Sequence, residues 1–213
     1  MGEFIFWFSA LCVFYAYFGY PLLLMLLIKL RSGNEVSILG SQIWPKLSII
    51  ITSRNEESVI RAKLENTLTL LYRDGTAESS GVEIIVASDA SDDGTDDAVR
   101  EFSSRGVRLV RVEERKGKEF AQRAAIKEAS GEILFFSDAK TKLSTDSLIN
   151  AVKYFADKNV GAISSFDRIE NEYKSQSGEG FYVRYEMLLR KLESDFYSLV
   201  GLSGSAFAVR REV

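Results

Sequence analysis

The sequence predicts an α/β fold, in which a mostly parallel sheet carries helices on both faces and follows one N-terminal transmembrane helix. Three observations lead to this prediction. The stretch from Phe4 to Ile28 contains no charged residue. After it, short and wholly apolar runs alternate with helical patterns, as in parallel sheets that are buried on both faces. Polar residues follow four of these runs, at the sheet edge where such folds bind ligands.

The N-terminal stretch is long enough to cross a membrane. At 1.5 Å per residue it measures roughly 37 Å, against about 30 Å for a hydrocarbon core. A cleaved signal peptide is the alternative, but it would have a basic start and a shorter apolar run. We therefore expect residues 1–31 to be a retained anchor. Because Glu3 precedes the span and Lys29 and Arg31 follow it, the positive-inside rule predicts an outer N-terminus and a cytoplasmic remainder at the inner cell membrane.

Composition excludes several kinds of chemistry. The chain has 213 residues, a formal net charge of −3, one cysteine and no histidine. Without histidine there is no Ser-His-Asp or Cys-His catalysis and no histidine-ligated zinc. The single Cys12 lies in the apolar stretch, which excludes a disulfide and a zinc cluster. The near-neutral charge gives no support for nucleic-acid binding. Carboxylates, Lys, Arg, hydroxyls or a cofactor must carry the chemistry.

The rest of the chain predicts a linker and one domain. Residues 32–43 are polar, and residues 44–213 are long enough for one core. Apolar runs predict the following strands: Leu47–Thr52, Val82–Ala87, Val107–Val112, Ile133–Phe136 and Val160–Ser164. Apolar residues at helical spacing predict the following helices between them: Glu56–Tyr72, Thr95–Ser103, Glu119–Ser130 and Thr145–Ala156. Gly131 fits as the C-terminal stop of the third helix.

Two further segments follow the last predicted strand. Glu179–Tyr197 predicts a longer helix with one apolar stripe. A helix packed on the core is the first interpretation, and a helix lying on the membrane surface near a lipid-linked acceptor is the alternative. The run Gly201–Arg210 is rich in small residues, which would let a ligand or another backbone approach closely.

The loop after the first strand reads Ser53-Arg54-Asn55-Glu56-Glu57. A helix cap explains much of it, because Asn55 is a good N-cap and acids in the first turn favour the helix dipole. The cap explains Arg54 poorly. This loop is therefore a candidate for ligand contact as well as for capping.

The loop from Asp89 to Thr95 follows the second strand. A turn and a cap would use some of its acidic residues, but it holds more acids than one cap needs. Asp89 comes directly at the strand end, so we expect it to face a ligand and to carry little core packing. Asp92 and Asp93 have capping as their simpler interpretation.

The third and fourth strand ends add basic and acidic groups. The run Glu113–Lys118 is typical of a solvated charge run, but Lys118 beside Gly117 at a helix N-terminus would also neutralise a phosphate. Asp138 and Lys140 follow the fourth strand. Oxygen ligands of this kind suit magnesium or manganese. The four ends together predict a nucleotide or phosphate ligand, with a metal.

These segments resemble family 2 glycosyltransferases with the Rossmann-like GT-A fold, in the membrane-anchored, cellulose-synthase-like branch. The resemblance rests on the following segments: Tyr17–Leu24, LSIIITSRNEE at 47–57, SDASDDGT at 88–95, Gly117-Lys118, Ile133–Lys140 and Gly204–Arg211. It implies a transferase that uses a nucleotide sugar, most often a UDP-sugar, and a glycan or lipid-linked acceptor in polysaccharide or glycoconjugate synthesis. It also implies inversion at the anomeric carbon, with a carboxylate base.

The resemblance implies roles for particular residues. Three of them would line the pocket of the donor nucleotide: Ser53, Arg54 and Glu56. Asp89 would bind the base, and Lys118 would lie near the diphosphate. Asp138 would contact the ribose or the divalent cation, manganese or magnesium, which neutralises the leaving group.

The chain departs from the family pattern at two places. Lys140 stands where the family usually has the second Asp of its metal motif, and an ammonium there would repel a cation or replace part of its charge. The family's catalytic base is expected beyond Val213, so the chain is expected to be a fragment or a truncated protein.

Three other hypotheses compete with a glycosyltransferase. A non-catalytic nucleotide-sugar-binding membrane module is motivated by Lys140 and the missing base. A receiver-like signalling domain would need its acidic pair after the first strand, where this chain has Asn55-Glu56-Glu57. A purely structural anchored domain leaves the four polar strand ends unexplained.

Overall fold

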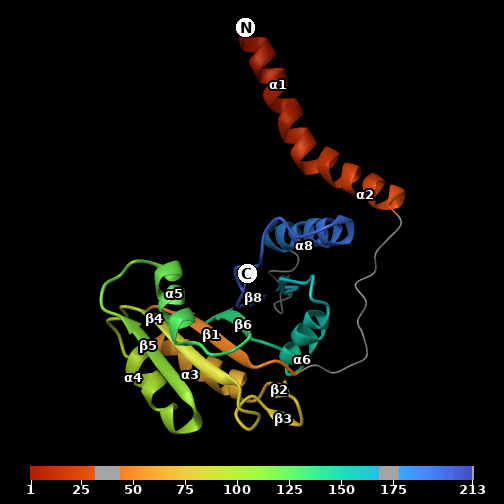
Figure 1. Ribbon diagram of the computed structural model, residues 1–213. Helices are drawn as coiled ribbons and strands as arrows, with labels where there is room; N and C mark the ends of the chain where they lie inside the picture. The colour runs from red at the N-terminus through yellow and green to blue at the C-terminus, as the bar shows by residue number, and fades with distance from the viewer. Residues whose placement is uncertain (32–43, 168–177, 213) are drawn as a thin grey trace. The chain divides into compact units, whose positions relative to one another are not determined.

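The computed structural model describes residues 1–31, 44–167 and 178–212 (Figure 1). The chain divides into two compact units. One combines Met1–Glu35 with Phe166–Leu202, and the other combines Val36–Ser165 with Ser203–Val213. The predicted linker lies outside the described residues. This division places residues 166–202 with the N-terminal helix, whereas the sequence grouped everything after residue 43 in one domain.

The second unit contains a six-stranded sheet in the order β5-β4-β1-β6-β8-β7. Its strands have the following bounds: β1 Leu47–Ser53, β4 Glu83–Asp89, β5 Val107–Val112, β6 Ile133–Asp138, β7 Ala162–Ser164 and β8 Ala206–Arg210. The first four in the order are parallel, while β8 runs antiparallel to both of its neighbours. The predicted α/β fold with a mostly parallel sheet is confirmed.

Helices cover both faces of the sheet. They have the following bounds: α3 Glu57–Leu68, α4 Thr95–Arg100, α5 Lys118–Glu128 and α6 Ser147–Val152, with short 3-10 turns at Ser103–Arg105 and Lys153–Ala156. Figure 1 shows α3 and α4 on one side of the sheet and α5 on the other.

The alternation of side chains along the central strand β1 explains this layering. Ile49 and Ile51 belong to the apolar cluster that includes residues of α3 and α4. Ile50, between them, belongs to the cluster that contains Ala121 and Ala125 of α5. Since successive side chains of a strand point to opposite faces, a wholly apolar strand needs both covers.

The first helix of this unit is shorter than predicted. We expected it to reach Tyr72, but α3 ends at Leu68, and a small hairpin of β2 (Leu71–Tyr72) and β3 (Gly75–Thr76) follows. Tyr72 is buried, and its hydroxyl donates a hydrogen bond to the Pro45 carbonyl. Tertiary contacts of Tyr72 therefore outweigh the helical spacing of the apolar residues.

The small-residue run after residue 201 contains strand β8, which pairs with β6 and β7, in line with the expectation that another backbone approaches it closely. The structure corrects one further expectation. Gly131 is not the residue at which α5 stops, because the helix ends at Glu128 with Ala129 as its C-cap. A Cβ at Gly131 would lie 2.5 Å from the Ser48 backbone nitrogen. Glycine is needed there for close approach to β1.

The first unit holds a long apolar helix and α8. The apolar helix runs from Gly2 to Leu30 and is the one helix of the described chain that is long and apolar enough to cross a membrane. It comprises α1 Gly2–Phe14, a π-helical turn at Tyr15–Gly19 and α2 Tyr20–Leu30.

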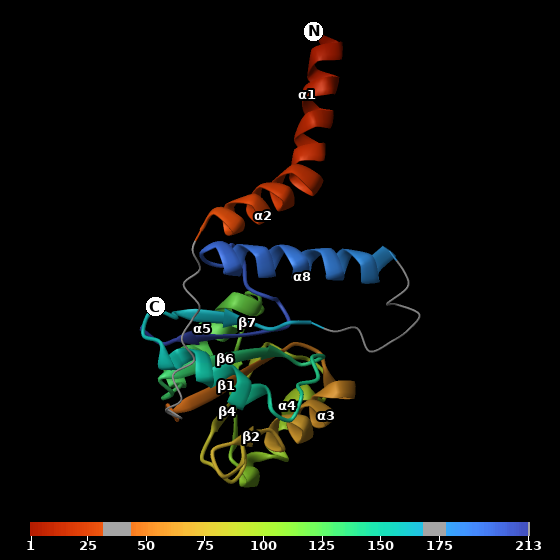
Figure 2. The same cartoon turned by 90° about the vertical axis from the view of Figure 1, so that its right-hand side faces the viewer.

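Helix α8 (Gly178–Phe196) lies beside α2 in this unit (Figure 2). The Tyr20 hydroxyl donates a hydrogen bond to Glu193 Oε1 at 3.0 Å. The apolar stripe of α8 is only partly covered, because Met187 and Leu192 are buried while Phe181 and Leu188 are exposed. The expected packing of this stripe in a core is therefore partial.

Candidate active site

A pocket lies at the carboxyl ends of β1, β4 and β6, the edge predicted for ligand binding. It has a volume of about 480 Å³, within the usual range for small-molecule sites. Its lining residues are Thr52, Ser53, Arg54, Glu56, Asp89, Arg115, Gly117, Lys118, Asp138, Ala139 and Lys140. The structure thus brings together all six residues proposed from the sequence as substrate-binding. Their individual roles stay predictions.

The end of β1 contributes two polar atoms that lack a partner. Ser53 is 3% exposed. Among the described residues, Ser53 Oγ and Arg54 Nε are buried without a hydrogen-bond partner. Because a buried polar atom costs free energy unless it is hydrogen-bonded, such atoms call for an explanation. Both residues line the pocket, although these two atoms are themselves shielded from solvent.

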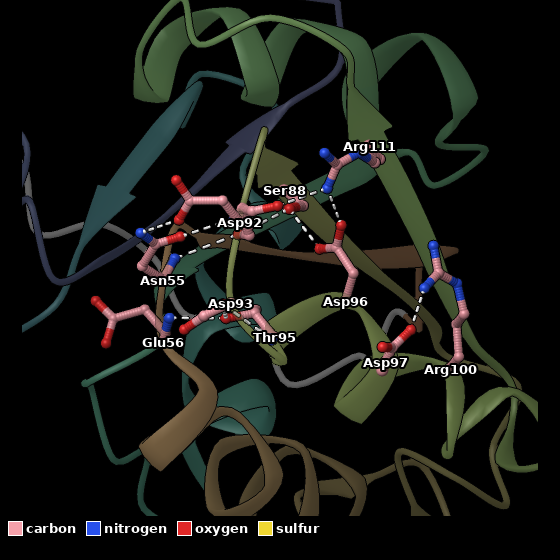
Figure 3. A network of polar contacts seen from close by, with 11 residues as sticks. Asn55, Glu56, Ser88, Asp92, Asp93, Thr95, Asp96, Asp97, Arg100 and Arg111 are labelled. Carbon is pink, nitrogen blue, oxygen red and sulfur yellow. Dashed lines mark hydrogen bonds and ion pairs between the residues drawn. The ribbon is translucent and has the colours of Figure 1, made fainter.

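The sequence led us to expect Asn55 as the N-cap of helix α3, but Asn55 does not occupy that position. The N-cap is Glu56, whose backbone N–H donates to Thr95 Oγ1 at 2.8 Å. Asn55 has a φ of 53°, and its amide exchanges two hydrogen bonds with Asp92, at 2.7 and 3.1 Å. Figure 3 shows this contact. Asn55 therefore ties the loop after β1 to the loop after β4.

The remaining acids of the loop after β4 are used within the fold (Figure 3). Asp93 accepts hydrogen bonds from the backbone N–H groups of Thr95 and Glu57, at 2.9 and 3.2 Å, which supports its interpretation as a capping residue. Asp96 forms an ion pair with Arg111 of β5. Asp97 pairs with Arg100 one turn along α4. The excess of acids is thus balanced locally.

Asp89 is buried more deeply than a rim residue would be. It is 4% exposed, and its carboxylate accepts hydrogen bonds from the backbone N–H groups of Lys116 and Gly117, at 3.0 and 3.1 Å. Gly117 has a φ of 92° and is the N-cap of α5. The expectation that Asp89 contributes little to the fold is wrong, because Asp89 accepts hydrogen bonds from the loop that precedes Lys118.

Two lysines in the pocket already have carboxylate partners. Lys118 Nζ lies 2.5 Å from Asp138 Oδ1 and also donates to the Gly204 carbonyl at 3.2 Å. Lys140 Nζ lies 3.1 Å from Glu56 Oε1. All four side chains line the pocket.

The side chains of the pocket do not form a complete cation site by themselves. The described residues contain no cluster of three Asp, Glu, His or Cys side chains that could hold a metal. Asp89 is committed to backbone N–H groups, and Glu56 to Lys140. Asp138 is paired with Lys118, so it could serve as a carboxylate ligand only after that contact is replaced. This arrangement fits a cation that takes its other ligands from a diphosphate and water, as magnesium does in nucleotide sites.

Sequence reasoning missed a buried lysine beneath the pocket. Lys63 of α3 is 3% exposed, and its Nζ donates to Ser137 Oγ at 2.7 Å and to the Thr141 carbonyl at 2.6 Å. Burial lowers the pKa of Lys63 to about 8, although the nearby Asp138 carboxylate acts in the opposite direction. The sequence did contain an indication of this burial. Lys63 comes three positions after Ile60, so a charged residue falls on the apolar stripe of α3.

The charge of the pocket suits an anionic ligand. Four basic side chains line it against three acidic ones, and Lys63 adds a charge from below. Gly117 and Lys118 begin α5, and a helix N-terminus favours phosphate. The fold and the site together define a nucleotide- or phosphate-binding α/β protein.

Comparison with known proteins gives the family. Residues 48–213 match the model of glycosyl transferase family 2, and the chain belongs to this family. A probable glycosyltransferase, YdaM of Bacillus subtilis, is 27% identical over 180 residues, which cover 79% of this chain and 41% of that protein. The poly-beta-1,6-N-acetyl-D-glucosamine synthase of Staphylococcus epidermidis is 28% identical over 149 residues, which cover 68% of this chain and 34% of the synthase.

A solved structure is similar over nearly the whole chain. The mannosyltransferase of Pyrobaculum calidifontis, in complex with GDP-mannose and Mn²⁺, has a TM-score of 0.75 and 30% identity. The match covers 95% of this chain and 55% of the mannosyltransferase. The chain therefore spans about half, or less, of the length of these relatives.

Proposed function

We propose that this chain forms the donor site of a membrane-anchored glycosyltransferase. The enzyme would transfer a sugar from a nucleotide sugar to a glycan or lipid-linked acceptor, with inversion, in polysaccharide or glycoconjugate synthesis. One observation carries the proposal. Ser53 and Arg54 line a pocket whose charges favour a diphosphate, and each keeps one buried side-chain atom without a partner among the described residues. Family membership supports the same reaction class.

Each pocket residue has a proposed part in donor binding. The part of the pocket that holds the nucleotide is lined by Ser53, Arg54 and Glu56. Asp89 has lone pairs left after its backbone contacts, because a carboxylate accepts about four hydrogen bonds, and it receives an N–H of the base.

The diphosphate end of the pocket is assigned to two residues. Lys118 neutralises the diphosphate, and Asp138 contacts the ribose or a divalent cation, manganese or magnesium. When bound, such a cation stabilises the charge of the leaving diphosphate. The base that activates the acceptor hydroxyl stays predicted beyond Val213.

A ligand screen by thermal unfolding tests the donor site. The full chain, in detergent micelles, would be heated with UDP-glucose, UDP-N-acetylglucosamine or GDP-mannose, each with and without Mn²⁺. A ligand at 100 times its dissociation constant adds roughly 2.7 kcal/mol, which raises the midpoint by about 5–10 °C for a domain of this size. UDP-sugars were our expectation, whereas the Pyrobaculum relative was solved with GDP-mannose, so the screen compares both.

Two variants make the screen specific. Arg54→Ala should abolish the shift, because it removes a pocket side chain. Arg100→Ala is the matched control, since this exposed arginine of α4 pairs with Asp97 away from the pocket. If no donor stabilises the wild-type chain, or if the two variants respond equally, the proposed donor site is wrong.

A nucleotide-sugar-binding module without catalysis is the second candidate. It is favoured by the lack of a three-ligand metal cluster among the described residues and by the ion pair of Lys140 with Glu56. Incubation with radiolabelled donor and Mn²⁺ tests the second candidate. Release of free sugar by the chain would exclude the module.

The helix Gly2–Leu30 supports the proposal of an anchor in the inner membrane. We place the N-terminus outside and the donor site in the cytoplasm, because Lys29 and Arg31 follow the span. In a Cys12→Ser background, a cysteine at Gly2 should react with a membrane-impermeant maleimide on intact cells. A cysteine at the exposed Lys158 should react only after lysis. The reverse pattern would invert the topology.

A further inference from the structure

The turn that carries Asp138 and Lys140 is held from below by one buried ammonium. Lys63 Nζ donates to Ser137 Oγ at 2.7 Å and to the Thr141 carbonyl at 2.6 Å. These acceptors belong to the residue before Asp138 and the residue after Lys140. A single group thus ties together both ends of the segment that enters the pocket.

The fold has no evident need for a charge at this position. Lys63 is 3% exposed, and within the described part of the chain it forms no ion pair. Burying an ammonium without a carboxylate partner is costly, and an apolar side chain of similar volume often does as well or better for stability. The charge is therefore better explained by the site than by the core.

An uncharged side chain near Lys63 holds the same loop by hydrogen bonds. Asn66, one turn along α3, donates to the Leu143 carbonyl and accepts from the Leu143 N–H, both at 2.9 Å. That contact holds the backbone of the same loop with an uncharged amide. The loop could thus be held without charge, yet the segment nearest the pocket is held by an ammonium that also attracts Asp138.

We propose that Lys63 is a positioning residue of the donor site, which fixes the direction of Asp138 by clamping Ser137 and Thr141. The inference rests on the proposed donor function. Lys63 is not among the residues that line the pocket, so it acts through the turn and does not touch the donor.

Lys63→Met tests the proposal, because methionine keeps an unbranched stem and removes the charge. Calorimetric titration of the full chain in detergent micelles, with UDP-glucose and GDP-mannose in turn and Mn²⁺ present, should show donor binding weakened roughly tenfold or more, as for other groups that orient a ligand-binding residue. Chemical unfolding should show only a small change of the midpoint, because the variant removes the cost of burying the charge but also takes the donor from Ser137 and Thr141. If Lys63 acted only in the core, Lys63→Met would lower the donor affinity and the unfolding midpoint together.

Thr67→Val is the matched control. Thr67 is buried on the same helix, and its hydroxyl donates to the Lys63 carbonyl; within the described residues its side chain forms no hydrogen bond to either end of the turn. This variant should lose stability and keep wild-type donor affinity. Ser137→Ala removes one acceptor of Lys63 and should weaken donor binding several-fold, which keeps the test decisive if Lys63→Met does not fold.

A double-mutant cycle with Asp138→Asn tests the route of the effect. If Lys63 acts by positioning Asp138, Lys63→Met should change donor affinity by less than about twofold in the Asp138→Asn background. An equal loss in both backgrounds would overturn the proposal, as would wild-type affinity in Lys63→Met. If the wild-type chain binds neither donor, the proposed function itself fails and the inference falls with it.

Discussion

Lys118 and Asp138 form an ion pair of 2.5 Å across the pocket, although they come from the start of α5 and the end of β6. The loop that delivers Lys118 is held by Asp89, and the turn that carries Asp138 is held by Lys63. In the proposed function the donor needs both members of the pair, Lys118 for its diphosphate and Asp138 for its ribose or cation. Donor binding must therefore replace their mutual contact.

Lys118→Met should weaken donor binding by about 10-fold to 100-fold, because a hydrogen bond to a charged group contributes roughly 1.5–3 kcal/mol. The fold should be little changed, since Lys118 is partly exposed. Calorimetric titration with UDP-glucose and GDP-mannose measures the loss. Arg100→Met, which removes an exposed cation from α4, serves as the control. Wild-type affinity in Lys118→Met would contradict the assignment of this residue to the diphosphate.

Asp89→Ala should lower both stability and donor affinity. The substitution leaves the Lys116 and Gly117 N–H groups without their acceptor, and a hydrogen bond to a charged group contributes roughly 1.5–3 kcal/mol. Urea unfolding measures the first effect and donor titration the second. Asp97→Ala, which removes an exposed acid of α4 paired with Arg100, should change neither. Unchanged stability in Asp89→Ala would show that the loop is held by other contacts.

Lys63 should make the protein more stable as the pH rises above about 8. Burial lowers its pKa to about 8 in the folded chain, against 10.5 as the ordinary value. Between these values the unfolded chain binds more protons than the folded one, so the free energy of unfolding increases with pH. Below pH 8 both states are protonated and the full cost of burying the charge is present. From pH 7.5 to 9.5 the gain should be about 2 kcal/mol.

The comparison with Lys63→Met isolates this contribution. Urea unfolding of both proteins at pH 7.5 and 9.5 gives the difference of interest, because all other titrating groups are shared. Methionine does not titrate, so the variant should lack the gain. Parallel pH dependence of the two proteins would show that Lys63 does not titrate in this range.

Lys140→Asp should strengthen Mn²⁺ binding in the presence of the donor nucleotide. It removes the ammonium paired with Glu56 and adds a second carboxylate two residues after Asp138, a donor set that suits a hard cation. Electron paramagnetic resonance of Mn²⁺ with the nucleotide measures the affinity. Lys140→Ala separates the two causes, because it removes the repulsion without adding a ligand. Unchanged Mn²⁺ affinity in Lys140→Asp would mean that the cation does not approach residue 140.

Several features of the fold were predictable because they depend on local pattern. The parallel strands β1, β4, β5 and β6 are short apolar runs, and the helices between them show their spacing in the sequence. Their order along the chain also predicts which strand ends share an edge. For this reason Ser53, Asp89 and Asp138 could be placed at one site before the structure was known.

Other features depend on partners that are distant in sequence. Strand β8 lies at the end of a segment rich in small residues, and its extended form is decided by hydrogen bonding to β6 and β7. Asn55 has the residue type of a helix cap, and only the position of Asp92 makes it a bridge between loops. Lys63 interrupts the apolar stripe of its helix in the sequence, but only the position of Ser137 on β6 shows what its charge contacts.

The sequence by itself determined the apolar N-terminal span, the α/β class and the set of polar residues at the strand ends, because each follows from residue type and periodicity. The tertiary structure decided which of those polar residues find partners within the protein and which keep an atom without one. Asp92, Asp93 and Asp96 found partners in neighbouring elements, whereas Ser53 Oγ and Arg54 Nε did not among the described residues. That division is set by which residues the fold brings close together, and residue type and periodicity alone do not reveal this.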